Sequence, residues 1–226
     1  MPRATSRGKC EFCGGEFGKA QMTRHLANCP QRAGTAPTSR AKAQPARLFH
    51  LIVEGRYEPI YWMHLEVPAD ISLNALDQFL RNKWLECCGH LSAYTIDGVR
   101  YASDVDPMWG LDDRNMRGVK LGAVAGPGAK FYHEYDFGTT TELNLRVVGE
   151  REAEARRNEI RLLAQNVAPV IPCDNCGAPA SEVCSQCIYE GRGWLCAECA
   201  PAHGCGEEML LPVVNSPRVG MCGYMG

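Results

Sequence analysis

The hydrophobic pattern divides the chain into a regularly patterned middle and two polar, cysteine-rich ends. Two apolar runs, 48–55 and 61–68, are rich in β-branched and aromatic residues and flank a turn at Gly55–Pro59. They predict two neighbouring strands. Over 70–85, after an Asp/Ser start signal, apolar residues recur at helical spacing. This stretch predicts an amphipathic helix that lays its apolar stripe on the sheet.

The rest of the middle region reads mostly as strands. The Asp97-Gly98 pair predicts the turn of a hairpin. Further strands are predicted at 118–124, 130–138 and 141–149, followed by a charged connection at 150–158. The last segment, 159–167, is a strand or a short helix, and we favour the strand. We therefore predict an α+β domain over residues 47–168, with an antiparallel or mixed sheet and a helix packed on one face.

The N-terminal end, residues 1–34, has the ligand spacing of a ββα zinc finger of the C2HC type. Its candidate ligands are Cys10, Cys13, His25 and Cys29. Phe17 and Leu26 are placed to pack beneath the metal, and Pro30 helps to end the short helix. The spacing predicts one structural zinc ion.

This finger is also basic, which suggests a partner. Its cations could meet the phosphates of a nucleic acid, or they could form a solvated face on a finger that docks a protein. One finger alone favours weak, mostly non-specific nucleic-acid binding. The basic residues are Arg3, Arg7, Lys9, Lys19, Arg24 and Arg32.

Residues 35–46 separate the finger from the middle region. They are small, polar and basic, contain two prolines and show no hydrophobic period. Such a composition predicts a flexible tether, so we expect the finger to move independently of the middle region.

The C-terminal end, residues 169–226, carries three C-x2-C pairs followed by three further candidate ligands. Repeated pairs of this kind are typical of zinc knuckles, and a disulfide framework is the less favoured alternative. The first residues lack the apolar core of a secretory signal, which also favours reduced thiols. The candidate ligands are Cys173, Cys176, Cys184, Cys187, Cys196, Cys199, His203, Cys205 and Cys222.

Composition and charge narrow the function class. The 226 residues have a formal net charge of −2, and no apolar run approaches the roughly 18 residues that a membrane span needs. We therefore expect no membrane partner and a cytoplasmic location. Charge is uneven: residues 1–50 carry +7, residues 51–170 carry −5 and residues 171–226 carry −4. An acidic C-terminal end argues against phosphate contacts there.

No catalytic constellation stands out in the middle region, so catalytic residues stay unknown. His90, His133 and Asp136 would form a candidate site only if they met in a pocket, and alternation along a strand separates His133 from Glu134 and Asp136. The plainer interpretation gives Asp136 a role in holding the Phe137-Gly138 turn. It treats His64 as a hydrogen-bonded core histidine, and Cys87 and Cys88 as packed thiols.

The order of the C-terminal pairs resembles the B-box and MYND class of cross-braced fingers. That resemblance implies that the first and third pairs share one ion. It also implies that the second pair shares another with His203 and either Cys205 or Cys222. Together with the finger, about three zinc ions are expected.

The middle region resembles the plasmid pRiA4b ORF-3 family. The resemblance rests on the helix after the VPAD turn, the segment around His90 and Tyr94, and the run Tyr132–Gly138. The NSPR-x-G-x-CGY tail at Asn215–Tyr224 also matches members with cysteine-rich ends. The family implies an α+β fold and a bacterial setting, sometimes beside mobile elements, but no established activity.

Three functional interpretations stay open at this point. The first is a zinc-binding adaptor that contacts nucleic acid through the basic finger and a protein through its acidic parts. The second is an enzyme with a site in the central α+β domain. The third is a purely protein-binding module with structural zincs.

Overall fold

The structure is a computed structural model that describes residues 6–33, 43–105, 112–156 and 158–226. The chain divides into two compact units. The first contains Met1–Leu80 and Leu91–Val167, and the second contains Arg81–His90 and Ala168–Gly226. The second unit therefore takes in a ten-residue excursion from the middle of the chain.

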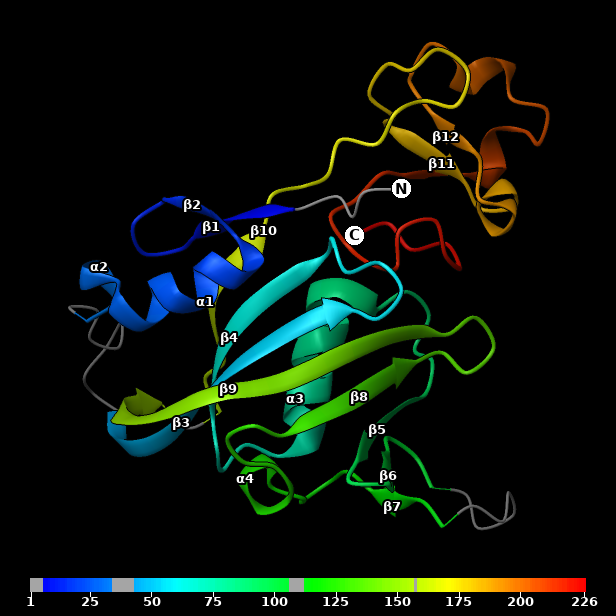
Figure 1. Cartoon of the computed structure of the whole chain (residues 1–226). Helices are drawn as coiled ribbons and strands as arrows, with labels where there is room; N and C mark the ends of the chain where they lie inside the picture. Colours follow the sequence, from blue (N-terminus) through cyan, green and yellow to red (C-terminus); the bar gives the residue numbers. More distant parts are fainter. Residues whose placement is uncertain (1–5, 34–42, 106–111, 157) are drawn as a thin grey trace. The chain divides into compact units, whose positions relative to one another are not determined.

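Among the described residues, one large sheet of ten strands organises the first unit (Figure 1). The strand order is β2-β1-β10-β4-β3-β9-β8-β5-β6-β7, and neighbours are antiparallel except for the parallel pair β6 and β7. The fold is thus α+β with a mixed sheet, as predicted. The strands are β1 (Arg7–Cys10), β2 (Glu16–Gly18), β3 (Ala43–Gly55), β4 (Trp62–Pro68), β5 (Ser92–Ile96), β6 (Val99–Ala102), β7 (Arg114–Asn115), β8 (Lys130–Tyr135), β9 (Thr141–Arg156) and β10 (Arg161–Asn166).

Helix α3 (Leu73–Leu80) covers one face of this sheet (Figure 1). The Ser72 hydroxyl oxygen accepts a hydrogen bond from the backbone N–H of Ala75, which is the start signal expected from the sequence. Leu73, Leu76 and Leu80 are fully buried on the stripe that faces the strands. The predicted helix is therefore confirmed up to Leu80, where the chain passes into the second unit as the π-helical turn η2 (Arg81–Leu85).

The Asp97-Gly98 hairpin is confirmed as the connection of β5 and β6. Both turn residues have positive φ, 48° for Asp97 and 76° for Gly98, which is the backbone that such two-residue loops require. The strand predicted at 159–167 is also confirmed, as β10.

Two local predictions are wrong. Residues 118–124 do not form a strand but contain the short helix α4 (Leu121–Val124), whose backbone bonds the loop before α3. The N–H of Gly122 donates to the carbonyl of Ala69, and a Cβ on Gly122 would lie 2.9 Å from that oxygen. Residues 150–156 are no connection either, because β9 continues to Arg156 and pairs with the start of β3.

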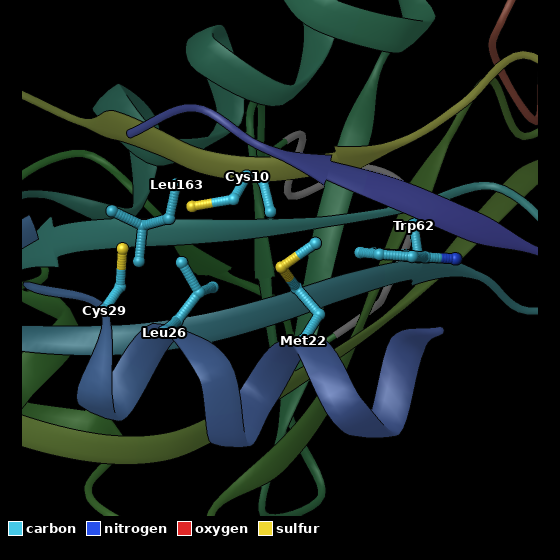
Figure 2. Packing of buried hydrophobic residues seen from close by; sticks show 7 residues of the cluster. Cys10, Met22, Leu26, Cys29, Trp62 and Leu163 are labelled. Carbon is cyan, nitrogen blue, oxygen red and sulfur yellow. The ribbon is translucent and has the colours of Figure 1, made fainter. Parts of the chain in front are cut away.

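The N-terminal finger shares the sheet and the core of the first unit. It consists of β1, β2, α1 (Lys19–Asn28) and α2 (Pro30–Ala33), and β1 pairs with β10. Figure 2 shows Met22 and Leu26 of α1 pointing at Trp62 and Leu163 of the sheet. Strand β1 also passes close over Trp62, since a Cβ on Gly8 would lie 2.3 Å from that indole.

Ion pairs connect the finger to the large sheet, one at the start of α1 and one in α2. Lys19 pairs with Glu54, and Arg32 reaches Glu66 at 2.8 Å. Burial would raise the pKa of Glu66, but its hydrogen bonds from Arg151 and Arg32 outweigh burial and lower it. The expected independent motion of the finger is therefore wrong. Residues 43–46 of the predicted tether belong to β3, and its remainder lies outside the described residues.

The second unit has a small three-stranded sheet in the order β12-β11-β13. Its buried apolar side chains fall into two groups: Trp84, Leu85, Val219 and Tyr224 in the excursion and the tail, and Val183, Leu195, Ala200 and Leu211 beside the buried cysteines Cys173, Cys184, Cys187 and Cys196. Besides η2, its elements are β11 (Glu182–Cys184), η4 (Cys187–Glu190), β12 (Trp194–Leu195), η5 (Ala200–Ala202), η6 (Glu207–Met209) and β13 (Leu210–Pro212).

Candidate metal centres and a cationic groove

The predicted ligands of the finger converge on one point. Cys10 ends β1, Cys13 lies in the following turn, His25 lies on α1 and Cys29 follows that helix. Their ligand atoms lie within 4.8 Å of one another, and Cys13 Sγ is 3.3 Å from His25 Nε2. On a tetrahedral zinc, a sulfur and a nitrogen ligand are about 3.6 Å apart and two sulfurs about 3.8 Å apart. The spacing therefore fits one zinc ion.

Neighbouring groups prepare this cluster for a cation. The Phe17 ring stacks on the His25 imidazole with centroids 4.1 Å apart, which fixes the ring that carries Nε2. Burial acts to raise the pKa of Cys29, but the backbone N–H groups of Arg32 and Gln31 outweigh it and lower the value. A stabilised thiolate is the form that a metal binds.

The first and third C-terminal pairs also converge. Cys173, Cys176, Cys196 and Cys199 place their sulfurs within 4.8 Å of one another, and the Cys176 and Cys196 sulfurs are 3.6 Å apart. A backbone N–H group at Cys196 is the main cause that lowers the pKa of Cys173 to about 6. Hydrogen bonding among the sulfurs, above all with Cys196, raises the pKa of Cys199 to about 12. A dication is the species that would let all four ionise together.

The second pair forms a separate cluster with His203 and Cys205. Cys187 Sγ lies 3.6 Å from His203 Nε2 and 3.7 Å from Cys205 Sγ, and Cys184 completes the group. The grouping follows the cross-braced order, and between the two alternatives for the fourth ligand the structure places Cys205 here. Gly193 has φ +105°, and a Cβ there would lie 2.8 Å from Cys187 Cβ, so this turn requires glycine.

Cys222 lies elsewhere in the second unit, beside Cys87, Cys88 and His90. The interpretation of Cys87 and Cys88 as packed thiols without a spaced partner is therefore wrong. A signal was present in the sequence: Cys87-Cys88-Gly89-His90 is a compact donor set, and Cys222 was one donor more than the second C-terminal site needs.

Cysteine and histidine clusters with this donor set and spacing favour zinc over harder metals, because soft thiolate ligands suit it and four donors complete its preferred geometry. Where the sequence led us to expect about three ions, the described residues contain four such clusters.

The residues of the conceivable catalytic site have different partners. His133 is fully buried and its Nε2 lies 2.7 Å from Asp77 Oδ1, under α3. The Asp136 carboxylate accepts the N–H groups of Gly138 and Thr139, which is the turn-holding role expected of it. His90 Nε2 is 3.3 Å from Cys222 Sγ, in the second unit.

His64 is a fully buried histidine, as expected, and its Nδ1 lies 2.8 Å from His50 Nε2. Burial is the main cause that lowers the pKa of His64 to about 3 and that of His50 to about 4. After His50, the next causes for His64 are the positive charges of Arg146, Arg32 and Lys19, which mark this side of the sheet as cationic.

A groove of about 390 Å³ lies on this side of the sheet. Lys130, Arg146, Ile52 and His64 are cross-strand neighbours on β8, β9, β3 and β4, so they share the face opposite His133 and α3. The finger covers the Trp62 end of this face, and Lys19 of α1 borders the groove.

The groove combines positive charge with an exposed aromatic ring. Lys130 and Arg146 are exposed, and Lys19 is paired with the only carboxylate among the described residues that line the groove, Glu54. Tyr132 is 42% exposed, and the Arg56 guanidinium lies 4.7 Å from the centre of its ring. Cations beside an aromatic platform can contact phosphate groups and a stacked base.

A second hollow, of about 420 Å³, lies near α4. Arg47, Lys120 and Arg156 line it together with Asp70, but the described residues of its lining include no aromatic ring. It therefore offers charge without a surface for stacking.

Comparisons with known proteins found a matching family and a similar solved structure. The family described as Plasmid pRiA4b ORF-3-like protein matches residues 49–183. A solved structure, a protein of unknown function (MM3350) from Methanosarcina mazei Go1, is 14% identical with a TM-score of 0.44. The match covers 62% of this chain and 78% of that one. Among curated proteins, none matches this chain. No helix in the described part of the chain is long and apolar enough to cross a membrane.

Proposed function

The chain belongs to the plasmid pRiA4b ORF-3-like protein family, and from this premise we propose that it is a zinc-stabilised adaptor that binds nucleic acid through the cationic groove. The zinc ions have a structural role in this proposal, because four protein ligands leave no open position for a substrate. The finger contributes by framing the groove with Lys19.

The observation that carries the proposal is the row of Lys130 and Arg146 beside Tyr132 on an open sheet face. The two side chains lie on neighbouring strands and on the same face, so their positive charges are close together, as contact with a phosphate backbone requires. Much of the finger's own charge is engaged: Arg32 and Lys19 bind carboxylates of the sheet, and Arg7 lies near Glu16. Arg3 lies outside the described residues.

The acidic second unit supports the adaptor part of the proposal. Residues 171–226 carry a net charge of −4, which repels phosphates and leaves this part for a protein partner. Reduced thiols are required throughout, so we propose a cytoplasmic location. A bacterial host with mobile elements is the setting that the family suggests.

The test uses the zinc-loaded full-length protein, because deleting the finger would remove two strands and part of the core. Binding to a single-stranded and a duplex DNA of equal length is followed by fluorescence anisotropy at about 50 and about 200 mM salt. We expect K130A/R146A to weaken binding about tenfold or more at low salt. It should also reduce the salt slope by about 1.4 to 1.8, as two lost phosphate contacts predict.

The matched control is R114A/R117A, which removes two exposed arginines of the same unit and changes the net charge equally. We expect it to bind nearly as the wild type does. Equal weakening by both double variants would show that net charge acts and not the groove. Absence of wild-type binding at low salt would overturn the proposal and direct attention to protein partners.

A further inference from the structure

The excursion Arg81–His90 and the C-terminal tail meet within the second unit around four donor atoms. Cys87, Cys88, His90 and Cys222 have ligand atoms within 4.8 Å of one another, and His90 Nε2 lies 3.3 Å from Cys222 Sγ. This is the same compactness as in the three clusters whose spacing is visible in the sequence. The donors come from segments 132 or more positions apart.

Polar contacts place the tail beside the excursion. The Ser216 hydroxyl donates a 2.6 Å hydrogen bond to the carbonyl of Trp84, and the backbone N–H of Arg218 donates to the Ser216 oxygen. Gly220, Cys222 and Gly223 all have positive φ, so the chain turns tightly as it presents the Cys222 sulfur.

Arg218 adds a charge that suits a metal–thiolate group. It is fully buried, and its Nη2 lies 3.3 Å from Cys87 Sγ. Three thiolates and a neutral imidazole around a dication carry a net charge of −1, which one guanidinium would balance. Donors of this kind next to ligand atoms orient and stabilise them.

The cysteine content points the same way. The chain has thirteen cysteines, and all of them fall into the four clusters, which three histidines complete to four donors each. If Cys87 and Cys88 served only to pack the excursion, we would expect their sulfurs to lie away from other metal-ligating atoms.

We propose that Cys87, Cys88, His90 and Cys222 bind a fourth zinc ion, which clamps the C-terminal tail onto the Arg81–His90 excursion. The ion closes a loop of more than a hundred residues, and cross-links that close long loops restrict the unfolded chain most. The NSPR-x-G-x-CGY tail then has a defined role: Ser216 and Arg218 position the tail, and Cys222 supplies the ligand.

The test measures zinc per chain in the purified full-length protein by elemental analysis. We expect four zinc ions in the wild type, one for each cluster, and three in both C222S and H90A. The double variant C222S/H90A should lose no further ion, because both side chains serve the same site. C222H, which keeps a nitrogen donor at this position, should retain the fourth ion.

Hydrogen exchange separates this site from general misfolding. In C222S, amides of residues 215–224 should exchange at least tenfold faster, while residues 173–205 keep their protection. M225S changes an exposed neighbour in the tail and should match the wild type.

Three zinc ions in the wild type would overturn the proposal, as would a C222S protein that keeps four. A disulfide joining Cys222 to Cys87 or Cys88 in the freshly purified protein, detected by mass spectrometry, would also overturn it, since an oxidised pair cannot bind the ion.

Discussion

The N-terminal finger and the C-terminal module use the same ligands in different surroundings. In the finger, Cys10 and Cys29 belong to an apolar cluster that includes Met22, Leu26 and Trp62. The C-terminal module has a three-stranded sheet, and thiols occupy many of its buried positions. The finger thus shares its hydrophobic core with the large sheet, whereas the module has its cysteine clusters at the centre of its packing.

This difference shows that zinc binding can contribute a smaller or a larger share of the folding free energy, depending on how much apolar packing surrounds the cluster. Where apolar packing already fixes the backbone, a metal adds to an existing fold. Where little apolar area is buried, metal binding supplies much of the folding free energy, about 10–16 kcal/mol in apparent terms for one structural zinc. Removing the metal should therefore destabilise the C-terminal module more than the finger. Disrupting the apolar packing should destabilise the finger more than the module.

The largest effect is expected from removing the metal. A strong chelator should abolish hydrogen-exchange protection over residues 173–211, because this region has few large buried apolar side chains. Residues 43–55 and 141–147 in the large sheet should stay protected, and residues 7–29 should lose protection only in part. Mass spectrometry of exchanged peptides measures all three.

Re-adding zinc is the control, and it should restore protection in the module. Equal loss of protection in the finger and in the module would contradict the comparison, since it would mean that the shared core contributes nothing to the finger.

A smaller effect is expected from breaking the packing. Trp62 is fully buried between the finger and the sheet, and its indole N–H donates to the Ser6 hydroxyl oxygen at 2.6 Å. Trp62→Ala should lower the free energy of unfolding of the first unit by about 3–5 kcal/mol. Urea unfolding measures this, with the exposed Phe137→Ala as the control. If zinc held the finger without help from the core, the hydrogen-exchange protection of residues 7–29 would survive this change.

The smallest effect concerns pH. The folded pKa values of His50 and His64, about 4 and about 3, are depressed mainly by burial, while the unfolded values are near 6.5. Stability is therefore fully present above about pH 6.5 and is lost as pH falls towards the folded values. Each histidine contributes a slope of at most about 1.4 kcal/mol per pH unit.

His50→Gln should remove one of these two contributions from the first unit. Urea unfolding at several pH values between about 7 and about 5 compares its slope with that of the wild type, so that protonation of metal ligands cancels in the difference. Identical slopes would show that His50 takes up no proton on unfolding and would remove its part in the pH dependence.

Local patterns in the sequence were sufficient for much of the fold. The apolar run at 61–68, the helical spacing of Leu73, Leu76 and Leu80, and the Asp97-Gly98 turn each act over a few residues, and each prediction is confirmed. Residues 118–124 failed because their backbone bonds a loop some fifty positions earlier. Residues 150–156 failed because strand pairing with the start of β3 outweighs their charge.

The candidate sites divide in the same way. Spacing along the chain identified the finger's ligand group, Cys10 to Cys29, and all the candidate ligands from Cys173 to Cys205. The division of the C-terminal ligands into two groups came from the resemblance to cross-braced fingers. Spacing could not place Cys222 with Cys87, Cys88 and His90, because their meeting depends on how the tail folds back on the excursion. The docking of the finger and the Lys130–Arg146 row likewise arise only from strand order and register. The sequence by itself determined the metal chemistry and the local elements, because these depend on neighbours along the chain. Only the tertiary structure decided which distant segments share a core, a groove or an ion, because a contact between segments a hundred residues apart produces no periodic pattern in the sequence.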